Sequence, residues 1–101
     1  MVSAPLPRAA DVPAAEINRS GELEVLVLVA EYGSLSAAAR RLGVSPSAVS
    51  KIMSRLESRL GVQLLRRSTR RIELTAEGAQ FYERGKQLLA DLNELETAVA
   101  S

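Results

Sequence analysis

The first regular pattern of apolar and polar positions in this chain predicts a helix over residues 20–33. Ser20 could cap its start, and Gly33 could end it in a left-handed conformation. The positions with the spacing of a buried helix face are Leu23, Leu26, Val27 and Ala30. Apolar residues also cover much of the other side: Val25, Leu28 and Val29. Either this helix is sandwiched inside the core, or its second side meets a partner chain, and we favour the partner.

Two further helices are predicted on either side of Gly43. Ser34 is a suitable N-cap for a short helix that ends at Leu42, and Gly43 can adopt the left-handed turn that follows. The next helix has Ser45 as its N-cap and Pro46 at its first position, where the missing N–H of proline is harmless. Its apolar residues lie within about 60° of one direction. They are Val49, Ile52, Met53, Leu56 and Leu60.

The opposite face of this third helix consists of small hydroxyl side chains and cations. The residues concerned are Ser47, Ser50, Lys51, Ser54, Arg55 and Ser58. Serine is a mediocre helix former, and a merely solvated face, which is the alternative interpretation, would more usually hold Glu, Lys and Gln. Short side chains let a helix backbone approach the DNA major groove, where hydroxyl and ammonium groups bond base edges and phosphates. This face is therefore a candidate DNA-reading surface.

The spacing around Gly43 is typical of a helix-turn-helix. Ala39, four residues before Gly43, allows two helices to cross closely, and Val49, six residues after it, can fill the space between them. Each feature is weak evidence alone, and together they favour a DNA-binding motif.

Two β-like runs, residues 63–65 and 71–74, flank a turn at residues 67–70 and predict a two-stranded wing. Four arginines lie at its tip: Arg66, Arg67, Arg70 and Arg71. Arginines placed there could reach phosphates or a narrow minor groove, and a solvated turn is the alternative.

A long final helix is predicted from Thr75, its N-cap, onward. Its heptad seam consists of Phe81, Leu88, Leu92, Leu95 and Val99, with Gly78 and Gly85 at the two intervening positions. The outer residues Asp91, Glu94 and Glu96 are acidic and would be out of place against DNA. We interpret this helix as the dimerising element, while a helix that simply packs on its own domain is the alternative.

Charge is distributed unevenly along the 101 residues. Residues 33–72 hold nine basic residues and one acidic residue, a net charge of +8, between flanks of net −3 and −4. The basic block favours a phosphate-binding face, although it could also simply keep the domain soluble. Residues 1–18 contain three of the four prolines and no apolar period, so we expect a flexible N-terminal extension without an assigned function.

Composition excludes several other classes of protein. The chain has no Cys and no His, which removes disulfides, Cys/His zinc sites and histidine bases, so we expect no metal, no cofactor and no enzyme activity. No stretch approaches the roughly 18 apolar residues of a membrane span, and no signal peptide is evident. We therefore expect a cytoplasmic protein without a membrane partner.

From about Ser20 to Val99 the sequence resembles the N-terminal DNA-binding region of LysR-type transcriptional regulators. The resemblance rests on LVAEYGSLSAAARRLGVSPSAVSKIMSRLESRLGVQLLRRSTRRIELTAEG. It implies a winged helix-turn-helix, a linker helix that pairs with that of a second subunit, base-reading positions at Ser45, Pro46, Ser47, Ser50 and Lys51, and wing arginines at Arg67 and Arg70. Many members have Gln-Pro where this chain has Pro46-Ser47, so its site sequence cannot be copied from relatives. Members usually continue into an effector-binding domain, which lies beyond this sequence and would hold any effector ligand.

The sequence thus predicts a mainly α fold: a winged helix-turn-helix of three helices and a two-stranded wing over residues 19–75, followed by a linker and dimerisation helix over 76–101. The expected partners are double-stranded DNA and a second copy of the chain, with a tetramer possible at full length. The expected DNA-binding residues are Ser34, Ser36, Ser45, Pro46, Ser47, Ser50, Lys51, Ser54, Arg55, Arg67, Arg70 and Arg71. The expected dimerisation residues are Val25, Leu28, Val29, Phe81, Leu88, Leu92, Leu95 and Val99. The alternative function is a helical interaction module whose basic face binds an acidic protein.

Overall fold

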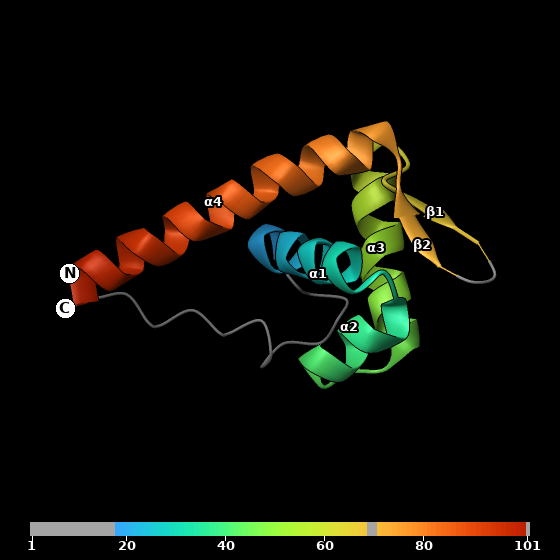
Figure 1. Cartoon of the computed structure of the whole chain (residues 1–101), viewed down its shortest axis with the longest axis horizontal. Coiled ribbons are helices and arrows are strands. Elements are labelled where there is room, and N and C mark those ends of the chain that lie inside the picture. The colour runs from blue at the N-terminus through green and yellow to red at the C-terminus, as the bar shows by residue number, and fades with distance from the viewer. Residues whose placement is uncertain (1–17, 69–70, 101) are drawn as a thin grey trace.

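The computed structural model describes residues 18–68 and 71–100, which form four helices and a two-stranded antiparallel sheet (Figure 1). In chain order the elements are α1 (Arg19–Tyr32), α2 (Leu35–Leu42), α3 (Pro46–Leu60), β1 (Leu65–Arg67), β2 (Ile72–Leu74) and α4 (Ala76–Ala100). The domain measures 50 × 25 × 25 Å, and α4 runs along its length (Figure 1). This arrangement confirms the predicted fold class. The expected flexible extension lies, apart from Asn18, outside the described residues.

Local capping chemistry sets the ends of the helices around the central turn. Ser34 Oγ accepts a 3.2 Å hydrogen bond from the backbone N–H of Ala37 at the start of α2. Ser45 Oγ accepts an equivalent 3.2 Å bond from the N–H of Ala48 at the start of α3, where Pro46 occupies the first position. The predicted caps of α2 and α3 are therefore confirmed.

The start of α1 differs from the sequence prediction. Asn18, and not Ser20, is the N-cap, since its side-chain oxygen accepts a 2.8 Å hydrogen bond from the N–H of Gly21. Asn and Ser are comparable N-caps, and the first turn begins two residues earlier than expected. Gly33 ends α1 in the left-handed conformation, with φ of +66°, as predicted.

The core is built around α1, which packs against α2, α3 and α4. Val25 and Val29 are 2% and 0% exposed in the single chain, and Leu28 is partly buried against the same cluster. The expectation that Val25 and Val29 meet a partner chain is therefore wrong, because the chain's own helices cover both side chains. Leu28 keeps part of its surface exposed. Leu60, expected to face inward, is 37% exposed and lies at the rim of the core.

The wing is a short antiparallel pair with the register Leu65 to Leu74, Arg66 to Glu73 and Arg67 to Ile72. Its first strand starts at Leu65, where the sequence prediction had it end. Thr75 holds the preceding segment instead, because its hydroxyl donates to Gln63 O at 2.6 Å and its N–H donates to Leu64 O at 3.0 Å. The same hydroxyl accepts a 2.9 Å bond from the N–H of Gly78, so the predicted cap of α4 is confirmed.

Two glycines bring α4 close to the rest of the domain. A Cβ at Gly78 would collide with the backbone of Leu64, and a Cβ at Gly85 would collide with the side chain of Leu23. Phe81, between them, packs partly buried against the core. Beyond Gly85 four large apolar side chains of α4 are exposed in the single chain, with exposed fractions between 43% and 78%: Leu88, Leu92, Leu95 and Val99. Leu89 is half-buried. Across the described residues, no helix has both the length and the apolar character needed to cross a bilayer.

Candidate nucleic-acid interface

The turn between α2 and α3 brings these two helices into close contact. Gly43 has a φ of +74°, and the N–H of Val44 donates to Ala39 O at 3.0 Å, which closes the end of α2. Ala38 and Ala39 are 0% and 1% exposed, so their small side chains allow the close crossing that a helix-turn-helix needs. Val49 is 0% exposed and fills the space between the helices. The motif predicted from spacing is thus present in the structure.

The first turn of α3 presents hydroxyl groups to solvent. Ser45, Pro46 and Ser47 are all exposed, and the hydroxyl oxygens of Ser45 and Ser47 lie 3.1 Å apart in a hydrogen bond. Further along the same helix Lys51, Ser54 and Arg55 are exposed. The predicted reading face of α3 is therefore open to a ligand over at least two turns.

The remaining predicted DNA-binding residues differ in how exposed their side chains are. Ser34 is half-buried, and its hydroxyl caps α2, whereas Ser36 in the first turn of α2 is exposed. Arg67 and Arg71 are exposed on the wing. Arg70 lies outside the described residues.

One wing arginine is bonded directly to α3. Arg67 Nη1 donates a 3.0 Å hydrogen bond to Ser50 Oγ, and Arg67 Nη2 lies 4.0 Å from Glu57 Oε1. Ser50 is half-buried, unlike its exposed neighbour Lys51. The wing and the reading face of α3 therefore form one connected surface.

Two carboxylates that the sequence analysis did not single out hold this surface in place. Glu57 Oε2 accepts hydrogen bonds from the backbone N–H groups of Leu64 and Leu65, at 2.7 and 3.0 Å, and so fixes the start of the wing to α3. Glu22, 8% exposed, accepts a 2.7 Å bond from Arg59 and ties α1 to the end of α3. A signal for Glu57 was available, because it is the one acidic residue in the basic block of residues 33–72.

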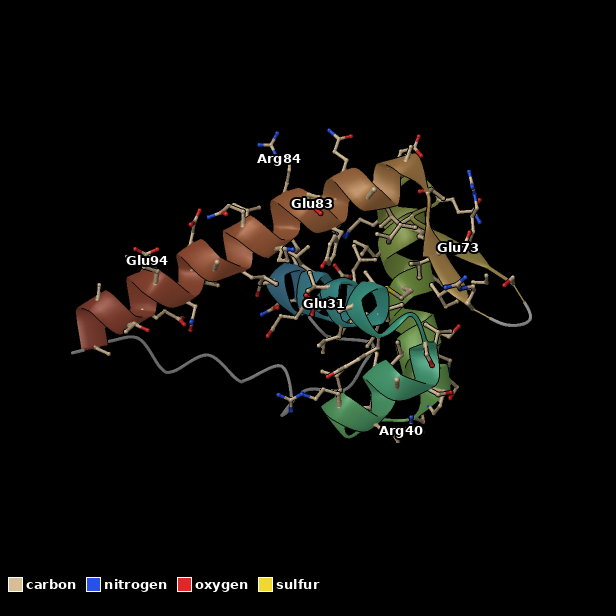
Figure 2. All side chains as sticks on the ribbon, viewed as in Figure 1. Glu31, Arg40, Glu73, Glu83, Arg84 and Glu94 are labelled. Atoms are coloured by element: carbon tan, nitrogen blue, oxygen red, sulfur yellow. The ribbon has the colours of Figure 1, made fainter. Side chains whose placement is uncertain are left out.

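Charged side chains of both signs lie on α4. Figure 2 places Glu83, Arg84 and Glu94 on α4 and Arg40 on α2, at the far side of the domain. On α4, Lys86 Nζ lies 3.5 Å from Tyr82 OH, and this hydrogen bond raises the pKa of the Lys86 ammonium. Within the described part of the chain no group of three potential metal ligands occurs.

An apolar hollow lies on the other side of the domain from Arg40, between α4 and the ends of α1 and α3. Its volume is about 420 Å³, and its apolar lining includes Leu23, Leu60, Val62, Phe81 and Leu88. Leu23, Leu60, Phe81 and Leu88 also line an adjoining hollow that extends along α4 to Leu92. The exposed apolar side chains of α4 are thus continuous with a groove beside the helix.

Comparison with known proteins identifies the family. Residues 21–79 match the family described as "Bacterial regulatory helix-turn-helix protein, lysR family". The transcriptional regulator CrgA of Neisseria meningitidis is 50% identical over 80 residues, which are 79% of this chain and 27% of CrgA. The regulator DmlR of Escherichia coli is 43% identical over 74 residues, 73% of this chain and 24% of DmlR. The chain spans about a quarter of the length of these relatives. They are named as transcriptional regulators and not as enzymes.

Solved structures give the same result. The DNA-binding domain of CbnR in complex with DNA matches with a TM-score of 0.72 and 39% identity, covering 83% of this chain and 100% of that one. The corresponding BenM domain in complex with catB site 1 DNA has a TM-score of 0.79 and 30% identity, covering 82% and 93% of the two chains. The chain therefore belongs to the lysR family of bacterial regulatory proteins and contains the family's winged helix-turn-helix DNA-binding domain.

Proposed function

We propose that this domain binds double-stranded DNA sequence-specifically as a homodimer, within a transcription regulator of the bacterial cytoplasm. In this proposal α3 occupies the major groove, and the wing reaches toward the adjacent minor groove. The observation that carries the proposal is the continuity of the exposed Ser and Lys face of α3 with the arginine wing through the Arg67 to Ser50 hydrogen bond. The solved DNA complexes of the CbnR and BenM domains support it.

The composition of the α3 face suits a groove rather than a flat partner. Ser45, Ser47 and Ser54 are short and exposed, so the helix backbone can approach base edges closely. Lys51, exposed in the middle of this face, provides a cation for a phosphate or a base acceptor. Arg55, Arg67, Arg70 and Arg71 extend the positive charge, with Ser34 and Ser36 as further contacts from α2.

The proposed dimer uses the C-terminal half of α4. Leu88, Leu92, Leu95 and Val99 are exposed apolar side chains on one seam, which in water favours pairing with a second apolar surface. The groove beside α4 supplies apolar surface next to this seam. Phe81 and Leu28 remain in the proposed interface at its edge, whereas the buried Val25 and Val29 are removed from it.

The whole protein is proposed to follow its longer relatives. An effector-binding domain after α4 would hold the ligand that regulates DNA binding, and a tetramer could form through that domain. Both proposals concern a domain that would follow α4 in the whole protein.

A basic face that binds an acidic protein is the competing function. Both functions predict affinity that falls steeply with salt, so salt dependence does not separate them. A competition experiment does: labelled duplex selected for binding is challenged with unlabelled copies, with shuffled duplex and with polyglutamate. Our proposal predicts displacement by the unlabelled copies at concentrations at least about tenfold lower than by shuffled duplex. Equal displacement by all three competitors would instead favour a non-specific basic surface.

A further inference from the structure

The hydrogen bond between Arg67 and Ser50 has a fixed direction. A guanidinium has five N–H donors and no acceptor, so in the 3.0 Å contact Arg67 Nη1 is the donor and Ser50 Oγ is the acceptor. The single hydroxyl hydrogen of Ser50 takes no part in this bond. The nearby positive charge also disfavours any orientation that points this hydrogen at Arg67.

A serine hydroxyl by itself carries little base information. It can donate to an acceptor or accept from an amino group, and for that reason Ser and Thr are found opposite either kind of base edge. A cation that occupies one of the two lone pairs and repels the hydroxyl hydrogen reduces this ambiguity. Ser50 is then biased toward donation.

Glu57 of α3 in turn helps to fix the position of the Arg67 side chain. Glu57 lies seven residues after Ser50, two turns along the same side of α3, and its Oε1 is 4.0 Å from Arg67 Nη2. The other oxygen of Glu57 accepts from the N–H groups of Leu64 and Leu65. The side chains of Arg67 and Glu57 are 36% and 19% exposed, so the contact is partly shielded from water.

We propose that Arg67 is a positioning residue that makes Ser50 a hydrogen-bond donor toward DNA, so that Ser50 selects a base presenting an acceptor in the major groove. The acceptors are guanine N7 and O6, adenine N7 and thymine O4, whereas the cytosine amino group is disfavoured. This inference rests on the proposed function, because it requires α3 to lie in the major groove. It assigns Arg67 a role in specificity through Ser50, in addition to the wing contact expected from the sequence.

The test is selection of bound duplexes from a random pool by six proteins. Four of them are the wild-type chain, Ser50→Ala, Arg67→Met and the double variant that combines these two substitutions. Methionine replaces the aliphatic part of the arginine side chain and removes its donors and charge. Arg67→Gln is the second variant at this position, because a neutral amide can either donate or accept and so restores the ambiguity. Arg66→Met is the matched control, since Arg66 is the adjacent strand residue, whose side chain points to the opposite face of the wing. Circular dichroism establishes that each variant is folded.

We expect Ser50→Ala to lower the base preference at one base pair by about fivefold, the usual worth of one neutral hydrogen bond. Both Arg67 variants should lower the preference at that same base pair, and the double variant should resemble Ser50→Ala there. Arg66→Met should weaken binding to all sequences alike. If the Arg67 variants weaken binding to all sequences alike and keep the base preference that depends on Ser50, the inference is overturned. The proposed function is not affected by that result. A wild-type chain that enriches no sequence would overturn the proposed function and the inference with it.

Discussion

The carboxylate of Glu57 in α3 accepts a 2.7 Å hydrogen bond from the backbone N–H of Leu64, which immediately precedes the wing. The N–H of Leu65 donates to the same oxygen at 3.0 Å, and both donors are partly buried. A single side chain of α3 thus fixes the base of the wing.

Replacing Glu57 with alanine should destabilise the domain by about 2–6 kcal/mol. The substitution leaves two partly buried N–H groups without their acceptor, each worth about 1–3 kcal/mol. Glu57→Gln is the control, because its amide oxygen can still accept from Leu64 and Leu65 while the charge is lost, and it should destabilise by less. Urea unfolding of the three proteins measures the difference, and equal stability of Glu57→Ala and the wild-type chain would contradict the assignment.

The two α4 glycines should respond differently to alanine. At Gly78 an added Cβ meets the backbone of Leu64, which cannot move without shifting the wing, so Gly78→Ala should destabilise by about 2 kcal/mol or more. At Gly85 the Cβ meets the end of the Leu23 side chain, which can rotate away. The higher helix propensity of alanine, worth about 0.5–1 kcal/mol, offsets part of that clash. Thermal unfolding should therefore rank Gly78→Ala clearly below Gly85→Ala, and the reverse order would show that α4 docks differently.

Substituting Leu92 and Leu95 with Asp should convert a dimer into monomers. These side chains are 43% and 60% exposed in the single chain, so the domain itself should remain folded, while charges on the seam oppose pairing. Ala90→Asp adds a charge on the opposite side of α4 and should leave the dimer intact. Sedimentation equilibrium over a range of protein concentrations gives the mass, and a double variant that still sediments as a dimer would exclude this seam.

Replacing Lys51 with alanine should weaken binding to a selected duplex by about tenfold and reduce the salt dependence by about one counterion if the ammonium meets a phosphate. Arg70→Ala is expected from the sequence to weaken binding as well. Lys86→Ala is the control, because it removes the same charge from exposed α4, and its effect should stay below about twofold. A titration in which Lys51→Ala and Lys86→Ala behave alike would remove Lys51 from the interface.

The caps and turns of this surface can be predicted from local sequence. The contacts that join its helices and its wing cannot. Ser34, Gly43, Ser45 and Pro46 act through their own neighbours in the chain, so their roles in capping and turning could be predicted. The β-like sequence pattern begins too early for the first strand, because Thr75 and Glu57, 12 and 7 residues away, hold Gln63 and Leu64 instead.

The periodicity of apolar residues in α1 does not show whether its second apolar side packs inside the domain or against a partner chain. A helix that is apolar on two sides is equally compatible with burial by its own domain and with burial by a partner. In the structure α2, α3 and α4 together cover α1, and Val25 and Val29 have no surface left for a partner.

In the proposed complex α3 lies in the major groove of a two-fold related site. Methylation protection by dimethyl sulfate tests it directly, because the reagent attacks guanine N7 in the major groove and adenine N3 in the minor groove. On a selected duplex, the wild-type chain should protect guanine N7 in two segments whose centres lie about 34–36 Å apart, or a multiple of that, and Lys51→Ala should lose this protection at equal protein concentration. Saturating protein that leaves every guanine N7 reactive, or that protects adenine N3 alone, would contradict the account.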